Sequence, residues 1–265
     1  MRRLWIYLAV TFGITWPLWW MLARQIPPGS SPLATGGGTA LYVLGGLGPT
    51  LAAFVAVALT PQQGTLREYA ARLIRWRVNP GWYAAALLGP ALLACVLERV
   101  TLWMHPLPAQ SLAPLAQVFT LFPLMIVGGG LEELGWRGVA QPLLQRRWPL
   151  LWACILVGIV WALWHLPLFF LHGVTQYGAN FLPFAVDVLA NALLLGWLYA
   201  NTGSILLCVL FHAASNTSTA MGLALPAGAP HALWLGARLG LGVLLVLFTP
   251  RPAGAGRAQG AGAGA

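Results

Sequence analysis

The stretch that decides the fold is GGGLEELGWR, residues 128–137, where two adjacent glutamates follow a run that is otherwise apolar. The chain of 265 residues has only five acidic side chains, so Glu132 and Glu133 hold a large share of them. A carboxylate at membrane depth costs roughly 3 kcal/mol or more unless it is paired, protonated or hydrated. We therefore take these two glutamates as the centre of a candidate active site.

The composition predicts an integral membrane protein. The chain is 59% hydrophobic and 7% charged, whereas a soluble globular domain carries about 25% charged residues. Strictly alternating polar and apolar residues, the pattern of a membrane β-barrel, are absent. The sequence therefore predicts an all-α, polytopic membrane bundle.

Apolar stretches of about 20 residues, the length that spans a bilayer, predict about eight transmembrane helices. They cover residues 4–22, 40–59, 82–104, 112–135, 150–171, 181–200, 204–223 and 231–248. Together they form one domain over residues 1–249, followed by a Gly/Ala/Pro-rich tail, 250–265, that is expected to be disordered. Within segment 60–81, arginines and apolar residues alternate at helical spacing, which predicts an amphipathic helix on the anionic cytoplasmic membrane surface.

The positive charge is distributed as in a membrane protein. All fourteen basic residues are arginine, and the net charge is +9. Because the arginines cluster in short loops between apolar spans, the positive-inside rule accounts for them without a nucleic-acid partner, and it predicts that both termini are cytoplasmic. The Arg-only composition indicates a GC-rich genome and hence a bacterial cytoplasmic membrane, with the lipid bilayer as the surroundings.

Spacing divides the roles of the two glutamates. Glu133 and Arg137 are four residues apart with the acid first, the better order for an ion pair on one helix face. Adjacent residues point about 100° apart on a helix, so Glu132 faces elsewhere. We expect Glu132 to be the reactive carboxylate, with no partner on its own helix, and Glu133 to be partly structural.

Other polar side chains lie within three further spans. A single intramembrane His or Asn is equally well explained as an interhelical hydrogen-bonding residue, but two acids with His165, His212 and Asn216 at membrane depth indicate a hydrolytic site. Asp187 and Asn191, also four apart, either support this site or serve packing. Glu132 and His165 can lie at the same depth in the membrane only if the fourth helix ends later than residue 135 or the fifth begins later than residue 150.

Three motifs carry a resemblance to a known family. EExxxR at 132–137, WxxxH at 161–165 and HxxxN at 212–216 occur in this order. They resemble the motifs of the CPBP (CAAX prenyl protease and bacteriocin-processing, or Abi) family of intramembrane proteases, over about residues 113–222. The second motif of that family usually begins with Phe, and we expect Trp161 to be tolerated because the role is aromatic packing.

The resemblance implies an eight-helix bundle whose catalytic cavity opens toward the cytoplasm and hydrolyses peptide bonds of a membrane-anchored peptide or protein. Glu132 would activate water, and His165 would orient that water or act on the leaving group. His212 and Asn216 would stabilise the oxyanion, and Arg137 would anchor Glu133. With a bacterial origin, a bacteriocin leader or another membrane-anchored peptide is the expected substrate.

A metal ion is an open alternative within this resemblance. Glu132, His165 and His212 would make a three-ligand Zn²⁺ site with one position open for water, but the chain has no HExxH helix, and water activated directly by a glutamate needs the same residues. Two other function classes remain: a non-catalytic immunity or scaffold protein of the same fold, and an ion-coupled transporter. Against the transporter, the halves of the chain show no internal repeat.

Overall fold

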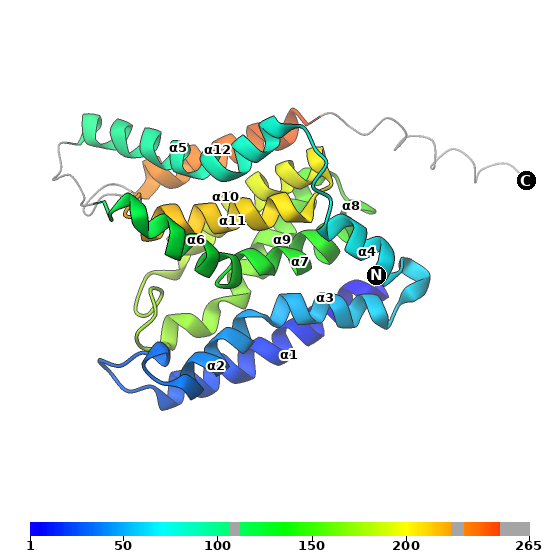
Figure 1. Cartoon of the computed structure of the whole chain (residues 1–265), viewed down its shortest axis with the longest axis horizontal. Helices are drawn as coiled ribbons and strands as arrows, with labels where there is room; N and C mark the ends of the chain where they lie inside the picture. The colour runs from blue at the N-terminus through cyan, green and yellow to red at the C-terminus, as the bar shows by residue number, and fades with distance from the viewer. Residues whose placement is uncertain (106–111, 224–230, 250–265) are drawn as a thin grey trace, which may run out of the picture.

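The computed structural model describes residues 1–105, 112–223 and 231–249, and over these residues its regular elements are all helices (Figure 1). The α-helices are α1 (Arg2–Gln25), α2 (Gly36–Gly46), α3 (Gly48–Ala58), α4 (Leu66–Leu73), α5 (Pro80–Met104), α6 (Val118–Val127), α7 (Glu133–Gly135), α8 (Gln141–Gln145), α9 (Leu150–Trp164), α10 (Phe181–Thr202), α11 (Ile205–Ala220) and α12 (His231–Leu247). Short 3₁₀ turns are η1 (Pro32–Ala34), η2 (Pro61–Gln63), η3 (Leu115–Gln117), η4 (Gly130–Glu132) and η6 (Leu166–Phe170), and η5 (Trp136–Ala140) is a π-helical turn. The all-α prediction is confirmed, and the predicted disordered tail lies outside the described residues.

The described helices are long and apolar enough for a polytopic membrane protein. Five segments reach spanning length, namely Arg2–Gln25, Pro80–Met104, Leu115–Gln145, Leu150–Phe170 and Phe181–Thr202. The pair α2 and α3, bent by 49°, makes a sixth if it counts as one span. The apolar helices α11 and α12 stand where the last two spans were predicted, but with 16 and 17 residues they are shorter. The chain is thus an integral membrane protein, and the total of eight spans stays a prediction.

The bend between α2 and α3 fits a glycine-rich stretch that the sequence marks as a kink or a close-packing site. A Cβ atom at Gly45 would lie 2.6 Å from Cδ1 of Trp19 on α1, so this position has no room for a larger residue. The hydroxyl of Thr15, also on α1, donates a hydrogen bond of 2.7 Å to the Gly45 carbonyl. Glycine thus permits both the bend and the close approach of α1.

The fourth predicted span needs a correction, because it does not end at residue 135. The spanning segment runs from Leu115 to Gln145 and is broken inside: α6 stops at Val127, and η4, α7, η5 and α8 follow in turn. We call residues 128–140 the broken segment. Glu133 and Arg137 do not mark an end of this span, because they neutralise each other inside the protein. Glu132 therefore lies near the middle of the span. The fifth helix begins at Leu150 as predicted.

The amphipathic helix of segment 60–81 is present as α4, although it is only eight residues long. Thr65 and Glu68 form a capping box at its N-terminus. On its inner face Tyr69 is buried and donates a hydrogen bond of 2.8 Å to the carbonyl of Leu134 in the broken segment. Burial raises the pKa of the Tyr69 phenol, so the hydroxyl stays a donor. The helix therefore supports the segment that carries the glutamates.

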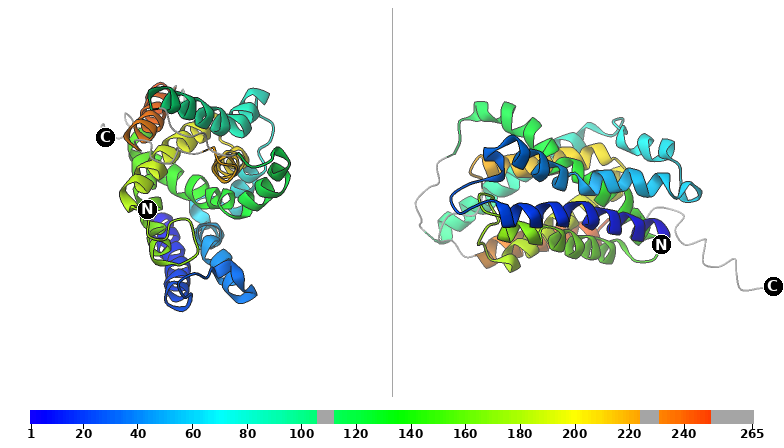
Figure 2. Two further views of the ribbon diagram at one scale, coloured as in Figure 1. Left: turned by 90° about the vertical axis from the view of Figure 1, so that its left-hand side faces the viewer. Right: turned by 90° about the horizontal axis from the view of Figure 1, so that it is seen from below.

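Helix α11 is central to the bundle and packs against α5, α6, α7, α10 and η4 (Figure 2). Helices α1, α2 and α3 form a separate group on one side, and α5 and α12 lie on the opposite side (Figure 1). This arrangement places the histidine and asparagine of α11 directly against the broken segment.

Candidate functional site

The broken segment carries both glutamates into the interior of the protein. Glu132 is 8% exposed, and Glu133 and Arg137 are fully buried. Charges in such surroundings persist only when other groups pair with them. The partners of each carboxylate therefore indicate its role.

Glu133 sits between two cationic or hydrogen-bonding partners. Its Oε2 lies 2.7 Å from the guanidinium of Arg137, so the predicted ion pair is present. Its Oε1 lies 2.8 Å from Nδ1 of His212 on α11. Arg137 also donates to the Ala192 carbonyl at 3.3 Å and lies over the Trp161 ring, 5.0 Å from its centroid. Glu133 therefore joins two of the three motifs.

The expectation that Glu132 has no partner on its own helix is wrong. Its Oε2 accepts hydrogen bonds from two indole N–H groups, Trp161 at 2.7 Å and Trp136 at 3.4 Å. Trp136 is four residues further along the same segment, so the spacing rule that paired Glu133 with Arg137 also points to this contact. Among the described residues, the other carboxylate oxygen, Oε1, has no hydrogen-bond partner.

His212 and Asn216 converge at Gly129, where the backbone is interrupted. A Cβ atom at position 129 would lie 2.9 Å from His212 Nε2 and even closer to Asn216 Nδ2. Because Nδ1 of His212 is engaged by Glu133, it is Nε2 that faces this space. Two side-chain nitrogens from one face of α11 thus point at the same small volume at Gly129, three residues before Glu132. Sequence analysis did not include Gly129 among the candidates.

His165 is held close by, although no hydrogen bond joins it to either glutamate in the described part of the chain. Its Nδ1 lies 2.9 Å from the Trp161 carbonyl. A carbonyl only accepts, so Nδ1 carries the proton and Nε2 is an acceptor in the neutral ring. The ring contacts Trp164 and Phe184, with centroids 4.6 and 5.1 Å apart. His165 is therefore positioned to accept a hydrogen bond rather than to pair with an acid.

The proposed zinc ligands do not form a metal-binding group in this geometry. Glu132 is bonded to two indoles, His212 to Glu133, and His165 to a backbone carbonyl. Over residues 1–105, 112–223 and 231–249, no set of three or more His, Cys, Asp or Glu side chains has the arrangement of a metal site.

Asp187 and Asn191 belong to a second polar cluster on α10 and α12. Arg238 lies 2.8 Å from the Asp187 carboxylate and donates to Asn191 Oδ1 at 2.9 Å. Sequence analysis missed Arg238, although an arginine within an apolar span needs such partners and was a usable signal. The cluster pairs its own charges, and no hydrogen bond joins it to the glutamates within the described residues.

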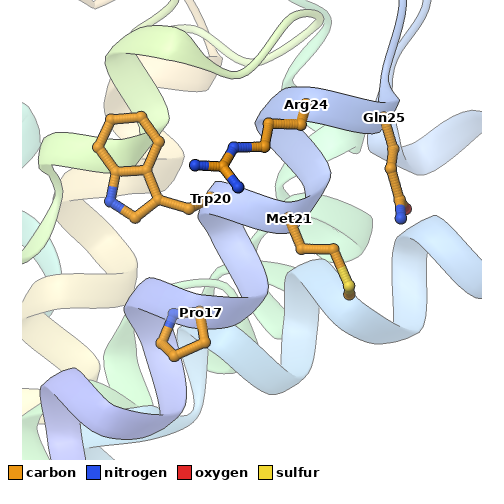
Figure 3. Close-up of a pocket in the computed structure, with 5 residues that line it drawn as sticks. All are labelled: Pro17, Trp20, Met21, Arg24 and Gln25. Atoms are coloured by element: carbon orange, nitrogen blue, oxygen red, sulfur yellow. The ribbon is translucent and has the colours of Figure 1, made fainter.

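A surface hollow of about 640 Å³ on α1 is separate from this chemistry. It is lined by Pro17, Trp20, Met21, Arg24 and Gln25, and Figure 3 shows these side chains along one helix. None of the candidate catalytic residues lines it. A second, much smaller cavity, of about 20 Å³, lies beside Arg238, Phe211 and Ser215, next to the α11 residues of the site.

Comparison with known proteins points to the same region of the chain as the motifs. Residues 114–218 match the family model described as type II CAAX prenyl endopeptidase Rce1-like. Over 99 residues the chain is 38% identical to CAAX prenyl protease 2 of Methanococcus maripaludis, a match that covers 34% of this chain and 35% of that relative. The matched region includes the broken segment, α9, α10 and most of α11. Over residues 114–218 the chain is therefore similar to the CAAX prenyl endopeptidases, in agreement with the resemblance to the CPBP family that its three motifs carry.

Proposed function

We propose that the protein is an intramembrane endopeptidase that hydrolyses a peptide bond of a membrane-associated protein, using water activated by Glu132. The observation that carries the proposal is the convergence at Gly129. Two side-chain nitrogens, from His212 and Asn216, face one small volume at Gly129. Three residues further along the chain, Glu132 is a buried carboxylate with one oxygen free of hydrogen bonds in the described residues. Such an arrangement provides a base and a pair of oxyanion donors.

The reaction starts with the free oxygen of Glu132, which takes a proton from a water molecule. The resulting hydroxide attacks the carbonyl carbon of the scissile peptide bond. In the tetrahedral intermediate, the negative oxygen accepts hydrogen bonds from Asn216 Nδ2 and from His212 Nε2 in its protonated form. The intermediate then collapses, the C–N bond breaks, and Glu132 returns its proton to the leaving nitrogen.

Glu133 and His165 have supporting roles in this scheme. Glu133 accepts the Nδ1 proton of His212 at 2.8 Å and so fixes the ring with Nε2 toward the space at Gly129. Arg137 holds Glu133 in place. His165, with its proton on Nδ1, presents Nε2 as an acceptor for one hydrogen of the attacking water.

Substrate class follows from the membrane setting and the family. The relative with 38% identity is named a CAAX prenyl protease, so a prenylated C-terminal peptide is a first probe. A membrane-anchored peptide without a prenyl group is the second probe, because the arginine-rich composition indicates a bacterium. Cleavage of only one probe would assign this chain to one of the two substrate classes, prenylated or unprenylated peptides.

The test is cleavage of both fluorogenic probes by purified protein in proteoliposomes. Glu132→Gln should abolish cleavage while thermal unfolding stays near that of the wild type. Glu98→Gln is the matched control, because Glu98 is a buried glutamate on α5, only 7% exposed, outside the site. If Glu132→Gln cleaves at the wild-type rate, the assignment is wrong. Metal analysis of the active protein, together with its response to a chelator, tests the zinc alternative separately.

A further inference from the structure

The position where this chain departs from its family's motif makes the shortest hydrogen bond to the candidate base. The CPBP motif usually has Phe where this chain has Trp161. Trp161 is 3% exposed, and its indole nitrogen donates to Glu132 Oε2 at 2.7 Å. A phenylalanine ring has no donor, so it cannot make this bond. The substitution therefore adds a contact to the proposed catalytic carboxylate.

The indole is itself fixed from several directions. The Arg137 guanidinium lies over its ring at 5.0 Å from the centroid, a cation–π contact. The His212 ring packs edge-on against it, with centroids 5.3 Å apart. The Trp161 carbonyl also accepts the Nδ1–H of His165 at 2.9 Å. One residue thus contacts Glu132, Arg137, His165 and His212, which together represent all three motifs.

The geometry selects one oxygen of Glu132. Both indole donors, Trp161 and Trp136, bond to Oε2, and Oε1 has no such bond among the described residues. A carboxylate with one oxygen held by rigid donors cannot rotate freely, because rotation would break both bonds. The other oxygen, Oε1, then keeps a constant direction and stays free to accept a proton.

We propose that Trp161 is a positioning residue whose indole N–H holds Oε2 of Glu132, so that Oε1 faces the attacking water. This proposal rests on the proposed endopeptidase function.

The kinetic test is Trp161→Phe, which restores the usual family residue and removes only the donor and part of the ring. We expect kcat to fall about tenfold to a hundredfold, as for a base whose direction is no longer fixed, with KM unchanged because the Trp161 side chain is buried and only 3% exposed. The matched control is Trp152→Phe, on the same helix, whose side chain is 57% exposed and outside the site. Unchanged kcat in Trp161→Phe would overturn the proposal.

A second measurement does not require activity or a stable Trp161 variant. In ¹⁵N–¹H spectra of the protein in detergent micelles, the Trp161 indole resonance should appear downfield, as expected for a donor to a carboxylate. Glu132→Ala should move it upfield, whereas Glu98→Ala should leave it in place. If the resonance does not respond to Glu132→Ala, the hydrogen bond and the proposal both fail. If the resonance responds but the wild type cleaves neither probe, it is the proposed function that fails.

Discussion

Gly129→Ala should remove most activity with little loss of stability, because of what the added methyl group would meet. The new Cβ would lie 2.9 Å from His212 Nε2 and closer still to Asn216 Nδ2. To reach an ordinary contact of about 3.4 Å, the histidine nitrogen must retreat by about 0.5 Å. His212 cannot retreat freely, because Glu133 holds its Nδ1 at 2.8 Å. Both proposed oxyanion donors are therefore displaced by one methyl group.

The magnitude follows from the role of the displaced groups. Loss of one oxyanion donor lowers kcat by about 10²–10³-fold, or roughly 3–4 kcal/mol of transition-state stabilisation. We expect Gly129→Ala to fall in this range. The atoms that the methyl group meets first are the ends of two side chains rather than backbone, so we expect the free energy of unfolding to change by about 1 kcal/mol or less.

The assay compares kcat and KM of Gly129→Ala with those of Gly89→Ala in proteoliposomes, together with thermal unfolding of each. Gly89 lies in α5, and a Cβ there would meet no atom within 4 Å, so this variant controls for the substitution itself. The reasoning is refuted if Gly129→Ala keeps a kcat within about threefold of the wild type, since displaced donors cannot leave the rate intact. Unfolding of Gly129→Ala would instead show that the site cannot adjust by moving side chains.

Three further predictions concern arginine side chains that are held by partners inside the protein. Arg137→Met leaves the fully buried Glu133 without its cation and should lower the free energy of unfolding by about 3–5 kcal/mol; a change below about 1 kcal/mol in denaturant melts would contradict the ion pair. Arg3→Met removes a buried guanidinium that donates to Thr60 and to the loop after it, 63–64. We expect the free energy of unfolding to fall by about 1–3 kcal/mol and an added protease to cut that loop faster. Proteolysis at the wild-type rate would contradict this prediction. Arg238→Leu removes the cation beside the Asp187 carboxylate and should lower the melting temperature while kcat at low temperature is retained; a selective loss of kcat would instead assign that cluster to catalysis.

Hydropathy was a good guide to where helices begin, and a poor guide to what happens inside them. The helix that begins at Leu150 and the one that ends at Met104 have the predicted limits, because apolar length and flanking Pro or polar residues fix these ends. The end of the fourth span was missed. There the charges of Glu133 and Arg137 cancel within the protein, so they do not have to reach water and do not mark a membrane boundary.

The sequence predicted which polar side chains come together better than it predicted how they pair. Spacing along one helix identified the Glu133–Arg137 ion pair, since residues four apart meet whatever the rest of the fold does. The His212 contact with Glu133 depends on how α11 is rotated against the broken segment, and a sequence does not give that rotation. The Trp161 contact was missed for another reason. The role at this position was taken to be aromatic packing alone, whereas the indole also brings an N–H hydrogen-bond donor.

The interruption of the helix at residues 128–140 has a consequence for protein engineering. Irregular backbone at membrane depth is tolerated only where other groups satisfy its amides and carbonyls. Here the Thr50 hydroxyl donates to the Leu131 carbonyl at 2.7 Å, and Tyr69 donates to that of Leu134 at 2.8 Å. A designer who transplanted only the three motifs into another bundle would leave these carbonyls without donors. The smallest portable unit of this site therefore includes two hydroxyl groups that lie more than 60 residues earlier in the chain.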